Sequence, residues 1–252
     1  MLFHKSFAAL AFCAALCGAD TKDVSKTLAL DATGSVTLET LRGSIHVTTW
    51  DRPEVEIKAR IEAAGSSSFD QRRFDHTDVA IDSSPHSVRI RSDYPPGSCC
   101  SWTTGENPDI HYTIRMPRTA RLTIHDHRSD TRIGDLVGAL AVDTHRGTIR
   151  IFGLAGPLDL KTHRGDVQVE FAAFTANSRL ETHRGTVELL LPGASRFNLE
   201  TNLDRKASID SDFQVLARIS GRRGRTLEGA VNGGGPVLRL STDKGRIHLR
   251  GK

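Results

Sequence analysis

The sequence has 252 residues, of which 38% are hydrophobic and 25% are charged, and its formal net charge is +4. This balance is typical of a globular protein of one large or two modest domains, and it excludes a disordered chain. Aromatic residues make up 6% and there are 22 glycines, so we expect an aliphatic core and frequent turns. The positive charge is mild, unlike the basic block of a nucleic-acid-binding arm.

The first 19 residues have the features of a secretory signal peptide. A short positive start precedes an apolar run from Phe7 to Leu16, and small residues follow up to Ala19. We expect export through the general pathway, cleavage after Ala19 and a mature domain over 20–252 in the periplasm or at the cell surface. A lipid anchor on Cys17 is disfavoured because lipoprotein signals usually carry a small residue where Leu16 stands. The apolar run is too short to span a bilayer, and no other segment is apolar enough to do so.

Only two cysteines, Cys99 and Cys100, would remain after cleavage, and they are neighbours. A disulfide between adjacent residues is strained because their Cα atoms are only about 3.8 Å apart. No disulfide framework is therefore expected, and structural zinc needs four spaced ligands. We interpret the pair as a loop feature; a vicinal bridge, an interchain link or two free thiols are the open alternatives.

A tetrapeptide repeat indicates the architecture. Thr-His-Arg-Gly begins at residues 144, 162 and 182, at intervals of 18 and 20 residues. Three identical tetrapeptides at near-constant spacing are evidence of an internal repeat. Less similar copies begin at Thr40, Asp126, Thr201 and Thr242.

Apolar residues alternate within each copy, and a period of two indicates strands. Leu158, Leu160 and Thr162 share one side before the corner, and Val167 and Val169 continue it afterwards. The glycine of each corner is expected to have a positive φ angle. A second corner recurs at glycines 138 and 156.

These features predict an all-β fold, a single-stranded β-solenoid whose rungs of 18–20 residues stack on one another about 4.8 Å apart. The general crossover rule favours a right-handed stack. A β-sandwich of hairpins is the competing all-β interpretation, but the repeats lack the Asn-Gly and Asp-Gly turns it would use. We expect irregular first rungs over 20–120 and regular repeats over 121–252, interrupted by an excursion over 211–235.

Several motifs in the chain resemble the bacterial putative-adhesin family. They are the Thr-x-x-Gly corners, Tyr112-Thr-Ile-Arg-Met-Pro117, Leu190-Leu-Pro192, and the segment from Gly233 to Thr242 before Gly245-Arg-Ile-His248. The resemblance covers roughly residues 30 to 252. It implies a β-solenoid and a cell-envelope location, and it brings no catalytic residues. This chain departs from the family in its repeated His-Arg and in the Cys99-Cys100 loop.

Stacked rungs would turn each repeated residue into a column that faces solvent at the corner. The first column, here named the His column, comprises His127, His145, His163 and His183. The second, here named the corner ridge, comprises Arg128, Arg146, Arg164 and Arg184, with Arg42 and Lys244 as candidate extensions. Guanidinium groups match carboxylates and phosphates bidentately, so the ridge indicates binding of an acidic polysaccharide or of lipopolysaccharide phosphates.

Other functions stay open. The corners could be only the wet surface of a structural envelope protein or of a scaffold that binds an envelope protein, and an open edge could allow self-association. Neutral imidazoles on adjacent rungs could share a metal ion. Catalysis is a further alternative, because some β-solenoids cleave acidic polysaccharides with Asp, Arg and Lys side chains. The cluster most similar to such a site is Asp126, His127 and Arg128.

We expect no enzyme, metal or cofactor, because catalytic motifs are absent. We also expect no specific nucleic-acid recognition, because no aromatic residues interleave with the ridge. The loop over 92–108 is a second candidate surface. Its candidate residues are Tyr94, Cys99, Cys100 and Trp102.

Overall fold

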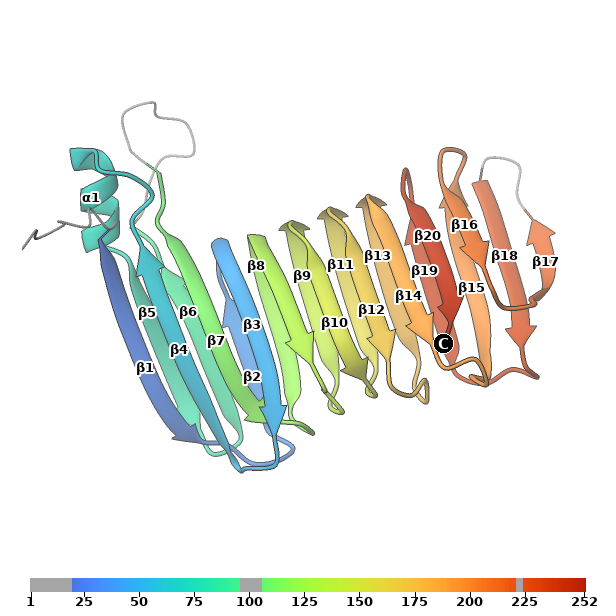
Figure 1. Ribbon diagram of the computed structural model, residues 1–252, viewed down its shortest axis with the longest axis horizontal. Helices are drawn as coiled ribbons and strands as arrows, with labels where there is room; N and C mark the ends of the chain where they lie inside the picture. Colours follow the sequence, from blue (N-terminus) through green and yellow to red (C-terminus); the bar gives the residue numbers. More distant parts are fainter. Residues whose placement is uncertain (1–19, 96–105, 221–223) are drawn as a thin grey trace, which may run out of the picture.

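The computed structural model describes residues 20–95, 106–220 and 224–252, which form twenty strands and one short helix (Figure 1). The predicted signal peptide, Cys17, Cys99, Cys100 and Trp102 lie outside these residues. In the described part of the chain, no helix is long and apolar enough to cross a membrane.

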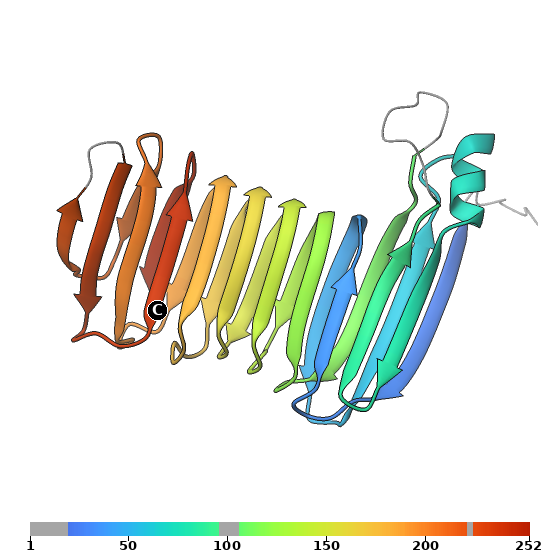
Figure 2. The ribbon, with the colours of Figure 1, turned by 180° about the vertical axis from the view of Figure 1, so that it is seen from behind.

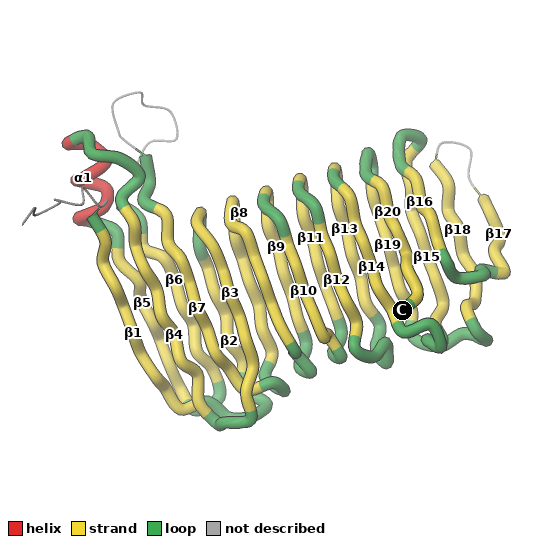
Figure 3. Tube along the Cα trace, viewed as in Figure 1, coloured by secondary structure: helices red, strands yellow, loops and turns green. Residues whose placement is uncertain are grey.

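Each regular rung consists of two strands joined by a Thr-His-Arg-Gly corner, which confirms the predicted solenoid-like all-β fold. The strands before the corners pair in parallel in one sheet, and the strands after them pair in parallel in a second sheet. Register is kept at each step, so Thr144, Thr162 and Thr182 lie opposite one another. The rung strands are β9 (Leu140–Arg146), β10 (Ile149–Leu154), β11 (Leu158–Arg164), β12 (Val167–Phe171), β13 (Ser178–Arg184) and β14 (Thr186–Leu191). The corners appear as short turns along the upper edge of Figure 3.

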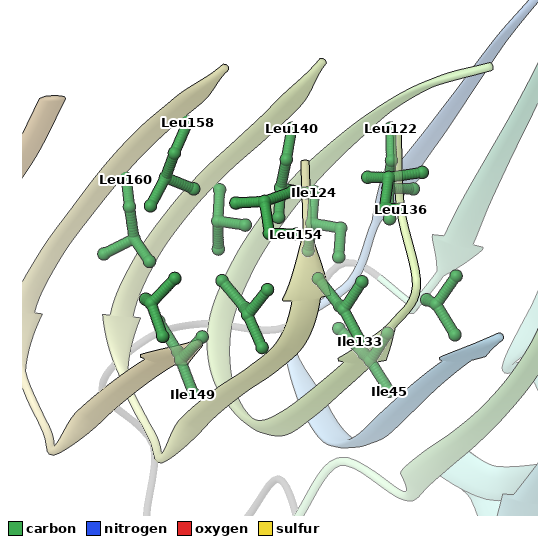
Figure 4. Packing of buried hydrophobic residues seen from close by; sticks show 14 of the residues in the cluster. Ile45, Leu122, Ile124, Ile133, Leu136, Leu140, Ile149, Leu154, Leu158 and Leu160 are labelled. Atoms are coloured by element: carbon green, nitrogen blue, oxygen red, sulfur yellow. The ribbon is translucent and has the colours of Figure 1, made fainter. Parts of the chain in front are cut away.

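The core lies between the two sheets and is built from the alternating aliphatic residues (Figure 4). Leu140, Leu158 and Leu160 on the first sheet face Ile133 and Ile149 on the second, and all five are buried. The long strand β8 (Arg121–Gly134) belongs to both sheets, because its first half pairs with β9 and its second half with β10. The prediction of an aliphatic inner face is therefore confirmed.

The rungs do not stack in chain order, so the expectation that each turn of chain lies on the preceding one is wrong at both ends. The last rung, β19 (Val237–Thr242) and β20 (Arg246–Gly251), lies between β13–β14 and the earlier strands β15 (Phe197–Asp204) and β16 (Ser208–Ser211). Strands β2 (Ser35–Glu39) and β3 (Arg42–Trp50) lie between β8 and the later strands β6 (Ser87–Asp93) and β7 (Asp109–Pro117). Which strands pair depends on their register and on the surface that pairing buries. Neither is determined by the order of the strands in the sequence.

The corner expected to begin at Thr201 is displaced. Leu203 lies opposite Thr242, whereas Thr201 lies opposite Leu240, two residues earlier. The turn that follows is also one residue longer, since Ser208 pairs with Arg246. Alternation alone permits a shift of two residues because it keeps the same side chains inside.

Antiparallel strands cover both ends of the parallel stack. At the N-terminal end, β1 (Thr21–Ala29) pairs with β4 (Glu54–Glu62), β4 pairs with β7, and β5 (Asp78–Ser84) pairs with β6. At the other end, β18 (Gly224–Val231) joins β15 to β17 (Leu216–Ser220). The N-terminal part therefore contains antiparallel pairs beside the parallel ones.

One helix, α1 (Ser68–Asp75), was not predicted from the sequence. Ser67 caps it by accepting a hydrogen bond from the Asp70 backbone N–H at 3.1 Å and donating to the Asp70 carboxylate at 2.6 Å. The Ser-x-x-Asp pattern that makes this cap was present in the sequence and could have indicated the helix start.

Candidate functional site

The corner sequence places each of its side chains by strand alternation and by one glycine. Thr144, Thr162 and Thr182 are the last inward residues and are buried. The His and Arg side chains that follow each Thr lie outside the core. They are exposed, except for His183, which is partly buried. Glycines 147, 165 and 185 then have φ angles of 138°, 146° and 140°, which confirms the predicted positive φ. Parallel register repeats this arrangement rung by rung, so the predicted columns form.

The His column is a stack of parallel imidazole rings. Successive ring centroids, from His127 through His145 and His163 to His183, are 4.9, 4.7 and 4.6 Å apart, with interplanar angles of 2–4°. The last ring also contacts a carboxylate, because His183 Nδ1 lies 2.7 Å from Asp243 Oδ2. The column is therefore regular in its middle and paired with an acid at one end.

Stacking lowers the pKa of His163 below its ordinary value of 6.5. Neighbouring groups remove water from its ring, and this desolvation is the largest cause of the lowered pKa. The positive charge that His183, His145, Arg164 and Arg146 would place beside a protonated ring lowers the pKa further. Charging the middle of the column is therefore unfavourable.

Acidification is expected to destabilise the protein through this ring. Because the pKa of His163 is lower in the folded chain than in the unfolded chain, the unfolded state takes up a proton first. The free energy of unfolding should then fall as the pH drops through about 6.5, while this group has no effect well above that pH. Urea unfolding at about pH 7.5 and about pH 5.5 should show a larger acid loss for the natural protein than for His163→Gln. Equal losses would contradict the assignment.

The geometry opposes a shared metal ion on the His column. A metal lies in the plane of each imidazole that binds it, and parallel stacked rings have no common in-plane position. Among the described residues, no group of three or more His, Cys, Asp or Glu side chains is arranged to hold a metal ion.

The corner ridge is in register, with Arg128 opposite Arg146, Arg146 opposite Arg164, and Arg164 opposite Arg184. Within the described ranges, none of these four guanidinium groups has a carboxylate within 4.0 Å. Carboxylates on the same rungs do not pair with them within the described residues. Glu181 instead pairs with Arg179.

Other arginines of the same stack are neutralised. Arg89 lies 2.5 Å from Glu39, and Arg239 lies 2.6 Å from Glu200. The ridge, by contrast, carries uncompensated charge in a row of four neighbouring rungs.

The candidate extensions of the ridge behave differently. Arg42 lies opposite Arg128, as the repeat predicted, but it is paired with Asp109 at 2.5 Å and Glu106 at 3.2 Å. It therefore adds no free positive charge. Lys244 is exposed, and its backbone N–H donates to the carbonyl of His183, which places it one rung beyond the ridge.

Asp126, the acidic member of the suggested catalytic cluster, has a structural role. It stands in register with Thr144, and its carboxylate accepts hydrogen bonds from that hydroxyl at 2.8 Å and from the Ser129 hydroxyl at 2.6 Å. It also accepts from the backbone N–H groups of Arg128 and Ser129. These bonds close a corner that lacks both Thr and Gly, and both carboxylate oxygens are occupied by them.

Two hollows flank the His column. A small one of about 250 Å³ includes Arg128 and Arg146 of the ridge, with Arg42 and Asn107. A groove of about 1020 Å³ follows the outer face of the first sheet below the corners. Figure 2 shows the strands of this sheet in front. The groove was not predicted from the sequence because its lining comes from seven strands that are spread over the chain from β2 to β19. Tyr94, predicted as a loop contact, lies at one end and packs against the core, and burial raises its pKa.

Comparison with known proteins agrees with this fold. A crystal structure of a putative cell adhesion protein from Clostridium sporogenes ATCC 15579 is similar, with a TM-score of 0.50 and 9% identity over 92% of this chain and 100% of that one. A putative adhesin from Bacteroides fragilis NCTC 9343 has a TM-score of 0.42 and 12% identity over 90% of this chain and 97% of that one. No curated protein matches the sequence.

The family comparison rests on the repeats themselves. The model of the Toastrack DUF4097 family matches residues 109–250, which span every regular rung and the interleaved last one. The resemblance inferred from the corner motifs is thereby confirmed. The match covers more than half of the chain, and the chain therefore belongs to the Toastrack DUF4097 family.

Proposed function

We propose that this protein is an adhesin-like binding protein of the cell envelope, and that its corner ridge binds an extended polyanion without catalysing a reaction. The observation that carries the proposal is the row of four exposed arginines, in register on adjacent rungs, that lack carboxylate partners in the described structure. Uncompensated charge held in register is available to an external ligand at every rung.

The shape of the ridge supports an extended ligand. Rungs repeat about every 4.8 Å, so the four guanidinium groups extend over about 14 Å in a line. Each of them can donate two parallel hydrogen bonds to one carboxylate or phosphate. Acidic polysaccharides and the phosphates of lipopolysaccharide are the two ligand sources with this chemistry. Export of the chain stays a prediction from residues 1–19, which N-terminal sequencing of protein recovered from the envelope would test.

The test is binding of the 20–252 chain to a polyuronate, to lipopolysaccharide and to DNA at low and high salt. A variant with Arg146, Arg164 and Arg184 changed to Gln should lose about tenfold or more in affinity for the polyanion. Exposed charge contacts are worth up to about 1 kcal/mol each, and 1.4 kcal/mol corresponds to tenfold. The remaining binding should also depend less on salt.

A charge-matched control separates the ridge from net charge. Arg121, Arg150 and Arg196 are exposed, have no ion pair among the described residues and lie outside the corners. Changing these three to Gln removes the same charge and should leave affinity within about twofold. If both triple variants lost the same affinity for the polyanion, the loss would be explained by net charge and not by the ridge. If the natural chain bound none of the probes, the corners would be only a solvated surface.

A further inference from the structure

The groove below the corners has a floor made by one continuous column of side chains. Pairing in register places one outward residue from each of seven neighbouring strands along it. In spatial order, the floor column is Arg91, Glu39, His125, Asp143, Lys161, Glu181 and Ser241. The His column forms a wall on the corner side, and Ser92, Asp93 and Tyr94 line one end.

The dimensions of the groove fit a single extended chain. Seven strands give six steps of about 4.8 Å, so the floor is about 29 Å long. A volume of about 1020 Å³ spread over that length leaves a narrow trough. Its axis runs across the strands, so a ligand lying in it would contact successive rungs with successive units. A polymer with a short repeating unit fits this shape better than a compact molecule does.

The charges of the groove are largely compensated, in contrast to the corner ridge. Three of its carboxylates have arginine partners: Glu39 with Arg89, Asp93 with Arg91, and Glu181 with Arg179. Asp243 contacts His183 at 2.7 Å.

The middle of the floor supplies mixed hydrogen-bonding groups. Asp143 and Lys161 are exposed neighbours of opposite sign that lie opposite each other on adjacent strands. The floor thus places carboxylates, which only accept hydrogen bonds, beside cations, which only donate them, and imidazoles line the wall.

Alternating donors and acceptors without net positive charge suit a ligand whose groups both donate and accept. Sugar hydroxyls have this property at every unit, whereas a polyanion would meet a lining that holds more carboxylates than cations. A peptide fits less well, because extended peptides bind through free strand edges or apolar pockets. Every floor strand is paired on both sides, and Leu41 and Tyr94 are the apolar side chains in the lining.

We propose that this groove is a second binding site, separate from the corner ridge, and that it takes a neutral polysaccharide chain lying across the strands. Asp143 and Lys161 at the middle of the floor contact the hydroxyl groups of the chain, and the His column bounds it. The protein would then hold a neutral glycan on one side of the His column and a polyanion on the other.

The test measures binding of neutral oligosaccharides of glucose, mannose and N-acetylglucosamine, from disaccharides to octasaccharides, to the 20–252 chain. Affinity should rise with chain length until the groove is filled, and it should change little with salt. The double variant Asp143→Ala with Lys161→Ala leaves net charge unchanged and should weaken binding at least tenfold. The matched control, Asp159→Ala with Arg150→Ala, removes an exposed acid and an exposed base outside the groove and should bind normally.

The ridge variant keeps the two proposals apart in the same assay. Changing Arg146, Arg164 and Arg184 to Gln should spare neutral glycan binding, and the groove variant should still bind the polyanion. No binding of any neutral oligosaccharide, or equal binding by the groove variant and its control, would overturn the groove proposal while leaving the ridge standing. Preference for an extended peptide over every oligosaccharide would likewise overturn it.

Discussion

Replacing Gly165 with alanine is expected to lower the free energy of unfolding by about 3 kcal/mol. Its φ angle of 146° is strained for any residue with a Cβ, at a cost of about 1–3 kcal/mol. A Cβ there would also lie 1.8 Å from the carbonyl oxygen of Gly147 on the neighbouring rung. That atom is backbone in a hydrogen-bonded stack, so relief requires two rungs to separate. Urea unfolding followed by circular dichroism measures the loss.

The matched control is Gly134→Ala, at the end of β8. A Cβ at this position would meet no atom within 4 Å, and its φ is not in the left-handed region. Its effect should stay within about 0.5 kcal/mol, as for ordinary surface substitutions. If the two alanine variants were equally stable, the close stacking of corner glycines would not be a requirement of the fold.

The second large effect concerns the interleaved last rung. Removing residues 233–252 takes β19 and β20 out of the middle of the stack and should unfold the strands beyond them. Four buried side chains go with it, at about 1.5–3 kcal/mol each, namely Leu238, Leu240, Ile247 and Leu249. Strand β15 also loses its parallel partner. Limited proteolysis should then cut readily within β15 and β16, where pairing protects the natural chain.

A longer deletion should be less harmful. Removing residues 194–233 would connect β14 directly to β19 through five residues, and natural links between rungs contain three (155–157) and six (172–177). The last rung would then follow its neighbour in chain order, with the corner ridge intact. We expect a folded protein that unfolds cooperatively, although at a lower urea midpoint because the end cover is gone. The observed rung order would be contradicted if the chain without residues 194–233 were unfolded, or if the chain without residues 233–252 were stable.

The local features of the fold could be read from the sequence because they depend on neighbours in the chain. Alternation determined which side chains enter the core, and the glycine after His-Arg determined where each corner turns. Equal spacing of Thr-His-Arg-Gly then implied the His column and the corner ridge, which the structure contains in register. Even the missed helix α1 had a local signal in Ser67 and Asp70.

The tertiary structure decided what depends on residues far apart in sequence. The positions of β19–β20 and of β2–β3 within the stack depend on which strands pair with one another. An alternation with period two is the same in every strand, so it cannot specify these pairings. Pairing of Arg42 with Asp109, 67 residues away, removed it from the ridge, whereas Arg146 and Arg164 stayed free in the described structure. The groove likewise exists only because seven strands from distant segments lie side by side. Short-range alternation thus determined the rung, and long-range pairing determined the order of the rungs and the surfaces they present.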